Sequence, residues 1–119
     1  MSDFEGYETC TEGSGSDHLE WGGWFEQNGE QTEMFLSKFK VKKSGKIKGK
    51  GSDTVGEFKF RGMKISNYFI AMKHYKHAHT IYYWGSATTD GDGEKCDLLE
   101  GSWGFEINEE QGPFRLAFA

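Results

Sequence analysis

The stretch from residue 47 to residue 85 constrains the fold more than any other part of the chain, because its pattern indicates four consecutive β-strands. Two of these strands are short and bounded by glycine, and two are long, aromatic and alternating in polarity. Alternation of apolar and polar side chains with a period of two is typical of strands that bury one face. The segments on either side repeat the pattern, so we expect one antiparallel meander.

The same pattern predicts eight strands along the chain, at residues 19–27, 32–42, 46–51, 55–61, 65–75, 79–85, 97–107 and 113–118. Turn-forming residues separate them, at Asn28-Gly29, Ser44-Gly45, Ser52-Asp53, Arg61-Gly62, Asp90-Gly91-Asp92-Gly93 and Gln111-Gly112-Pro113. Short strands at this spacing predict an all-β fold, either an eight-stranded antiparallel up-and-down barrel or a curved sandwich closed at one edge.

Length and composition agree with this fold. A chain of 119 residues corresponds to one domain. Its 10 Phe, 5 Tyr and 4 Trp favour a packed β core, because disordered chains are poor in aromatic residues. We divide the chain into an acidic N-terminal strap, residues 1–17, and a single barrel domain, residues 18–119.

Alternation assigns one face of each strand to the core. The predicted core side chains are bulky enough to fill a small barrel: Trp24, Met34, Leu36, Phe58, Phe60, Tyr68, Ile70, Met72, Ile81, Tyr83, Leu99, Trp103, Phe105, Phe114, Leu116 and Phe118. The strand at 32–42 differs, because Phe35, Phe39 and Val41 are predicted opposite Met34 and Leu36. Two apolar faces imply that the strap or a partner covers the outside of this strand.

Charge is divided into three blocks along the chain. Residues 1–37 carry nine acidic residues and no Lys or Arg, residues 38–76 carry twelve basic residues against two acidic ones, and residues 77–119 carry two against eight. The blocks therefore have net charges of −9, +10 and −6, which sum to the overall −5. Solvated strand faces would account for this layout, and so would a basic surface that orients acidic partners.

Two elements are candidate partner-binding sites. The first is the strap, in which Phe4 and Tyr7 are the large apolar side chains, and we expect them to anchor it on the barrel or on a neighbouring molecule. The second is a basic strand face with Phe35 and Phe39 beside the lysines Lys38, Lys40, Lys42, Lys43, Lys46, Lys48 and Lys50. The favoured alternative for the lysines at 46–50 is protection of an exposed sheet edge. Overall acidity argues against a nucleic-acid partner, although aromatic residues beside lysines occur on barrels that bind single strands.

The segment Gly22-Gly23-Trp24, the eight-strand meander and Arg115 on the last strand resemble the calycin-type barrels: lipocalins, avidins and fatty-acid-binding proteins. In lipocalins an Arg near the chain end packs on the indole of a first-strand Gly-x-Trp. The resemblance therefore implies that Trp24 and Arg115 close one end of the barrel. It also implies a small apolar ligand as an alternative function.

Motifs for metals, cofactors and catalysis are weak. His77 and His79 share a strand spacing that can hold zinc or copper, but they fall where a hairpin turn is expected. The acidic run at 90–97 departs from a calcium loop in spacing and has no flanking helices. No nucleophile elbow or P-loop occurs, so we expect no enzyme activity and no cofactor.

The N-terminus lacks the basic start and apolar run of a signal peptide, and no window is long and apolar enough for a membrane helix. We therefore expect a cytoplasmic location without membrane binding. The first functional hypothesis is a non-catalytic structural or adaptor subunit of a larger protein assembly, for which a cytoskeletal or ciliary setting would suit. The second is an intracellular binder of a small apolar ligand in the barrel.

Overall fold

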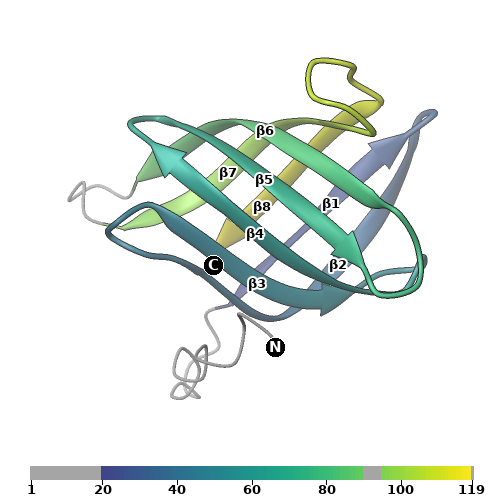
Figure 1. The fold of residues 1–119 in the computed structure, drawn as a ribbon, viewed down its shortest axis with the longest axis horizontal. Coiled ribbons are helices and arrows are strands. Elements are labelled where there is room, and N and C mark those ends of the chain that lie inside the picture. The colour runs from purple at the N-terminus through teal and green to yellow at the C-terminus, as the bar shows by residue number, and fades with distance from the viewer. Residues whose placement is uncertain (1–19, 90–94, 119) are drawn as a thin grey trace.

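A computed structural model describes residues 20–89 and 95–118, and these form a closed eight-stranded barrel (Figure 1). Each strand pairs antiparallel with its neighbours in sequence, and β1 pairs with β8 to close the wall. The up-and-down barrel is thus confirmed over the curved sandwich closed at one edge. The strands are β1 (Trp21–Gln27), β2 (Glu30–Val41), β3 (Lys46–Ser52), β4 (Glu57–Ile65), β5 (Tyr68–Tyr75), β6 (Thr80–Thr89), β7 (Cys96–Gly104) and β8 (Gly112–Phe118).

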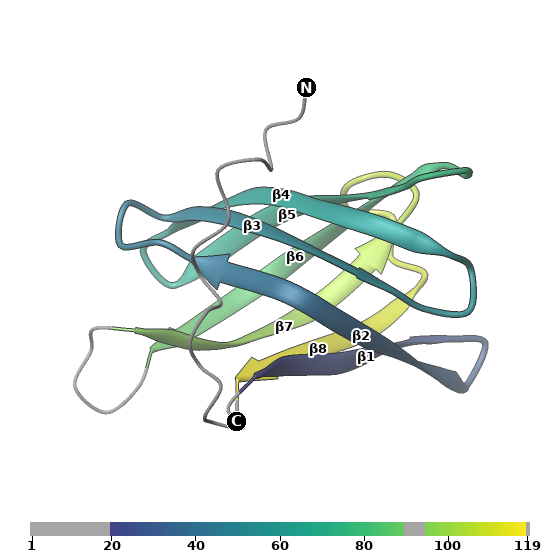
Figure 2. The same ribbon diagram turned by 90° about the horizontal axis from the view of Figure 1, so that it is seen from below.

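The two ends of the barrel differ. One end, called the loop end here, carries the connections β1–β2, β3–β4, β5–β6 and β7–β8 and lies to the right in Figure 1. The other end carries the β2–β3 and β4–β5 turns, the start of β1 and the end of β8. Figure 2 shows β1 and β8 adjacent along the closing seam.

The predicted turn at Arg61-Gly62 is wrong, because both residues lie inside β4. The chain reverses at Ser66 and Asn67, where Ser66 has a positive φ of 57°. This two-residue turn fixes the hairpin register, so that Phe58 pairs with Tyr75 and Phe60 with Lys73.

The face assigned to β5 is also wrong. Tyr68, Ile70 and Met72 were expected in the core, but they lie on the outer face of the barrel. The side chains that point inward are Phe69, Ala71, Lys73 and Tyr75. Both faces of β5 are largely apolar, so alternation could not choose between them, and the pairing with β4 decides.

An irregularity in β2 explains its two apolar faces. The register with β3 shifts between Leu36 and Lys38, so that Ser37 is an extra residue in β2. Such a bulge changes which side chains point inward beyond it. Phe39 therefore joins Met34 and Leu36 in the interior, against the prediction, while Phe35 stays outside and is 63% exposed. Val41, also predicted on the outer face, packs partly buried against the core.

Side chains fill the interior. Ten of the predicted core residues are confirmed as buried: Met34, Leu36, Phe58, Phe60, Ile81, Tyr83, Leu99, Trp103, Phe114 and Leu116. Their rings meet edge to face, for example Phe60 with Tyr83 and Tyr83 with Phe114, a geometry that aromatic quadrupoles favour. The core prediction is wrong for Trp24, which is half-buried, and for Phe105 and Phe118, which are 44% and 38% exposed.

Candidate functional site

A lysine lies inside the barrel near the loop end. Lys73 is on β5, and its side chain points inward because its strand partner is the buried Phe60. Neither Lys73 nor the carboxylate facing it, that of Asp53, has any side-chain solvent exposure. An isolated buried charge would cost several kcal/mol, on the order of a whole domain's stability, so this pair needs compensating contacts.

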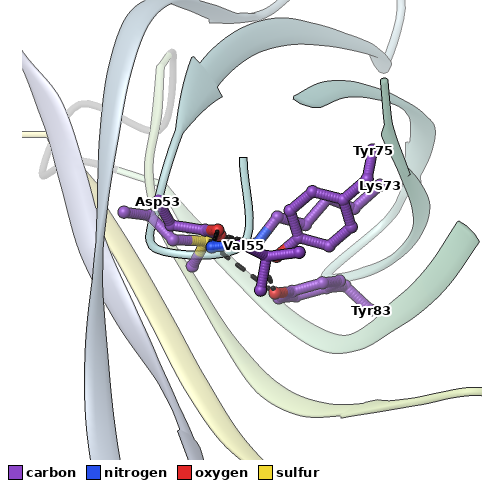
Figure 3. A network of polar contacts seen from close by, with 6 residues as sticks. Asp53, Val55, Lys73, Tyr75 and Tyr83 are labelled. Carbon is purple, nitrogen blue, oxygen red and sulfur yellow. Dashed lines mark hydrogen bonds and ion pairs between the residues drawn. The ribbon is translucent and has the colours of Figure 1, made fainter. Parts of the chain in front are cut away.

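Those contacts form a small polar network (Figure 3). The Lys73 ammonium donates to Asp53 Oδ2 at 2.6 Å, to Tyr83 Oη at 3.2 Å and to Met34 Sδ at 3.3 Å. The hydroxyl of Tyr75 donates to the same Asp53 oxygen at 2.7 Å. The other oxygen, Asp53 Oδ1, accepts the N–H of Val55 at 2.8 Å. Both carboxylate oxygens of Asp53, the residue after β3, therefore accept hydrogen bonds that hold its side chain in place.

Aromatic rings surround the ammonium group. Lys73 Nζ lies 4.3 Å from the ring centre of Phe58, 4.6 Å from that of Phe25 and 4.8 Å from that of Tyr75. Cations are attracted to aromatic faces, more strongly where water is excluded. The rings therefore offset part of the cost of moving this charge out of water.

Burial perturbs the titration of three groups in the network. It lowers the pKa of Lys73 to about 8, although the charge and hydrogen bond of Asp53 act in the opposite direction. It raises the pKa of Tyr75 and of Tyr83, and the negative Asp53 adds to both increases. The two phenols therefore stay protonated at neutral pH, and Tyr75 remains able to donate.

The network acts on the β3–β4 loop. Asp53 and Gly56 exchange two backbone hydrogen bonds of 3.1 Å, which close the loop into a turn. The Asp53 side chain then reaches from this turn into the barrel and ties the loop to Lys73 and Tyr75 of β5. We call the buried Asp53–Lys73 ion pair, with the hydrogen bond from Tyr75, the Asp53 clasp, because it joins the β3–β4 loop to strand β5 and is shielded from solvent.

Sequence reasoning missed this clasp. Asp53 was interpreted as a turn residue and Lys73 as part of an outer face. The available signal was the pairing that a turn at Ser66-Asn67 imposes, since it places Lys73 beside Phe60.

A groove crosses the outer face of β2 to β5 at the loop end. Its volume is about 780 Å³. We call it the basic groove, since Lys50, Lys59, Lys76 and His74 line it together with one acidic residue, Glu57. Its other lining residues are Phe35, Leu36, Ser37, Gly51, Ser52, Phe58 and Tyr75.

The predicted lysines gather on the outer face of the barrel. Strand pairing sets Lys38 opposite Lys50 and Lys40 opposite Lys48, and β4 continues this face. Lys46 is at the start of β3, and Lys42 and Lys43 follow β2 in the turn away from the loop end. The edge-protection hypothesis is wrong, because β3 is paired along both sides and the closed barrel leaves it no free edge.

An apolar strip runs along the outer face of the β4–β5 hairpin. We define it as Met63, Ile65, Tyr68, Ile70 and Met72. Met63 pairs with Ile70 and Ile65 pairs with Tyr68, so these side chains are direct neighbours. Ile65 and Tyr68 are each 69% exposed. Exposed apolar side chains that cluster in this way mark interaction surfaces.

The remaining predicted partner and closing residues are placed as follows. Phe39 is buried against Trp21 and Phe60, so it does not belong to the outer face. Trp24 and Arg115 are strand partners across the β1–β8 seam, and Arg115 lies 3.9 Å from Glu100. Their role in closing the barrel stays a prediction. Phe4, Tyr7 and the strap as a whole lie outside the described residues.

The histidine pair shows no metal-site geometry. His79 packs its ring against Tyr75 and Phe105, and His77 lies in the β5–β6 turn. Within residues 20–89 and 95–118, no three His, Cys, Asp or Glu side chains gather closely enough to hold a metal ion. The centre of the acidic run, residues 90–94, lies outside the described residues.

The described part of the chain contains no helix with the length and hydropathy needed to span a bilayer.

No family model, no curated protein and no solved structure matches the chain. What holds of the calycin resemblance is the architecture, a closed up-and-down barrel of eight antiparallel strands.

Proposed function

We propose that this protein is a non-catalytic adaptor that docks through its outer surface onto other proteins of a larger assembly. The observation that carries the proposal is the presence of apolar side chains on both sides of the barrel wall. The interior is filled with aromatic side chains and a clasped ion pair, while five apolar side chains cluster on the outside.

The packing of the interior supports surface docking over carriage of an apolar ligand. The largest side chains there, Trp103, Tyr83 and Phe60, are each 1% exposed and occupy the space in which a carrier would hold its cargo. Asp53 also forms a buried ion pair with Lys73 and accepts a hydrogen bond from Tyr75 inside the barrel near the loop end. A ligand would have to displace rings and break a buried ion pair.

The apolar strip is suited to be the centre of an interface. Its side chains stand on a regular hairpin paired on both sides, so little conformational entropy is lost when they become ordered. Tyr is enriched among the residues that dominate binding energy, and Met adapts to irregular partner surfaces. Tyr68 and Ile65 are the most exposed members and are the expected anchors.

Basic side chains flank the strip and indicate the chemistry of the partner. Lys46, Lys48 and Arg61 line a shallow depression of about 390 Å³ together with Met72 of the strip. Charges at the rim of an apolar contact steer association and select partners of opposite sign. The partner we propose therefore presents apolar side chains within an acidic surface. A cytoskeletal or ciliary assembly stays a prediction.

Site-specific photo-crosslinking in cells that naturally express the protein tests this function. A photoreactive amino acid in place of Tyr68 is expected to give one defined protein adduct. The matched control is Thr88, an exposed outer position on β6, which is expected to give none. The added substitution Ile65→Asp should abolish the Tyr68 adduct. Absence of a protein adduct at Tyr68, or equal adducts at Tyr68 and Thr88, would overturn the proposal.

A further inference from the structure

Although β1 starts at the end of the barrel opposite the loop end, its first residues lie near the basic groove, because Gly22 pairs with Phe35 in the middle of β2. Strand pairing forms a continuous row across the wall, in which Gly22 of β1 faces Phe35, Phe35 faces Ser52, and Ser52 faces Glu57. Three of these four residues line the groove. Neighbouring strands are about 4.8 Å apart, so the first residues of β1 lie within roughly 5 to 15 Å of the groove along this row.

The electrostatics of the groove select for negative charge. Lys50, Lys59 and Lys76 outnumber Glu57 among the charged residues that line it. Lys76 and Glu57 are 4.0 Å apart and exposed, so their mutual attraction is weak. Phe35, 63% exposed, offers a large apolar surface at the same site.

The sequence that precedes β1 has the complementary chemistry. Residues 1–17 contain five acidic residues, Asp3, Glu5, Glu8, Glu12 and Asp17, and no Lys or Arg. They also contain two aromatic residues, Phe4 and Tyr7, that could stack on an exposed ring. At about 3.3 Å per extended residue, this segment is long enough to cross four strands several times over.

We propose that the basic groove is a binding site for an acidic, aromatic-bearing polypeptide segment, and that its occupant is residues 1–17 of the same chain. Covalent attachment gives this segment an effective concentration in the millimolar range, which favours it over free peptides of similar affinity. The contacts are largely ionic and exposed, so binding weakens as salt shortens the screening length.

The proposal adds a competition step to the adaptor function. The groove and the apolar strip lie at opposite ends of the same β4–β5 hairpin. An acidic partner that extends from the strip toward the loop end would have to displace residues 1–17. This consequence rests on the proposed function, whereas occupancy of the groove does not, and occupancy can be measured without any partner.

Paramagnetic relaxation in the full-length protein provides the test. The chain has two cysteines, Cys10 and Cys96, so Cys96→Ser leaves Cys10 as the single point of attachment for a nitroxide spin label. The amide resonances of Lys50, His74 and Lys76 are expected to broaden at low salt and to recover at about 1 M NaCl, where the screening length is near 3 Å. Amides of β8 serve as the internal reference.

Charge-reversal variants decide whether the groove is the cause. Lys50→Glu with Lys76→Glu should abolish the broadening. The matched control, Lys42→Glu with Lys43→Glu, makes the same change in net charge in the turn at the other end and should leave it unchanged. An equal loss in both variants would overturn the proposal, since it would indicate a general attraction of the acidic segment to the lysines of the barrel and no specific binding in the groove.

A mixed sample separates the chain's own segment from a second copy. Protein that carries the spin label but no nitrogen-15 is mixed with protein that carries nitrogen-15 but no spin label. The proposal is supported if the groove amides broaden when one molecule carries both the spin label and nitrogen-15, but not in the mixture. Broadening of equal size in the mixture would assign the groove to another copy and overturn the proposal. Absence of broadening in the groove in both samples also overturns it, and this result would leave the Tyr68 crosslink unaffected.

Discussion

Both faces of β5 are largely apolar, and the lysine of the strand lies on the inner face. The inner face carries a lysine among aromatic rings, and the outer face carries Tyr68, Ile70 and Met72. The inner lysine is tolerated because Asp53, Tyr83 and the rings satisfy it. The outer apolar residues have no comparable cover among the described residues. The comparison teaches that contacts, and not hydropathy, distinguish the inner face of this strand from its outer face.

Removal of the Asp53 carboxylate should have the largest effect on stability among the substitutions that test this comparison. The variant Asp53→Ala leaves Lys73 as an unpaired buried cation and removes the acceptor of Tyr75. We expect a loss of about 3–5 kcal/mol in the free energy of unfolding, measured by urea denaturation. The double variant Asp53→Ala with Lys73→Met removes the charge as well and should recover most of the loss. A double variant as unstable as the single one would contradict the account of the inner face.

The pH dependence of stability is the next largest effect. Lys73 has a pKa of 10.5 in its unperturbed state and about 8 in the fold, so between these values the unfolded chain binds more protons. Stability should therefore rise with pH in this window, by up to about 3 kcal/mol. Above about pH 10 the rise should reverse, because the pKa values of Tyr75 and Tyr83 are raised and the unfolded phenols ionise first. Denaturation at pH 7, 9 and 11 measures both the rise in stability and its reversal. The variant Lys73→Met should not show the rise.

The hydroxyl of Tyr83 has a smaller effect. It accepts a hydrogen bond from Lys73 at 3.2 Å and lies 3.8 Å from Met34 Sδ. Tyr83→Phe keeps the ring and its edge-to-face contacts, so we expect a loss of about 1 kcal/mol. Differential scanning calorimetry measures it, and a stability equal to that of the wild type would show that the lysine needs only Asp53 and the rings.

Substitutions on the outer face should have the smallest effect on stability. Ile70→Thr and Met72→Thr keep a high β-propensity and change side chains that are 40% and 36% exposed. Each should alter the free energy of unfolding by less than about 0.5 kcal/mol. Both should nevertheless weaken the Tyr68 crosslink to the partner. A large loss of stability in either variant would show instead that the apolar strip contributes to the stability of the fold.

The sequence was sufficient to predict the barrel, because most strands have one clearly apolar face. Strand β4 shows this best, with Phe58 and Phe60 both confirmed inside and Lys59 and Arg61 on the opposite face. Both residues of the Asn28-Gly29 turn adopt positive φ angles, as the hairpin prediction requires.

The errors arise where local pattern is ambiguous and distant pairing decides. Because the turn between β4 and β5 was predicted at Arg61-Gly62, the pairing implied by the sequence did not put Lys73 beside Phe60. The bulge at Ser37 has no glycine or proline to indicate it, so Phe39 was assigned to the wrong face. Asp53 has the composition of an ordinary turn residue, and its role follows only from the fold, which brings it 2.6 Å from a lysine twenty positions away.

Native mass spectrometry of the protein purified from its own cells tests the central claim most directly, since it reports what accompanies the barrel. The account predicts the mass of the chain alone or in a stoichiometric complex with another protein, with no small molecule retained. A small apolar molecule retained by the intact fold would contradict the account. It would show that the interior, and not the outer face, is where this protein binds.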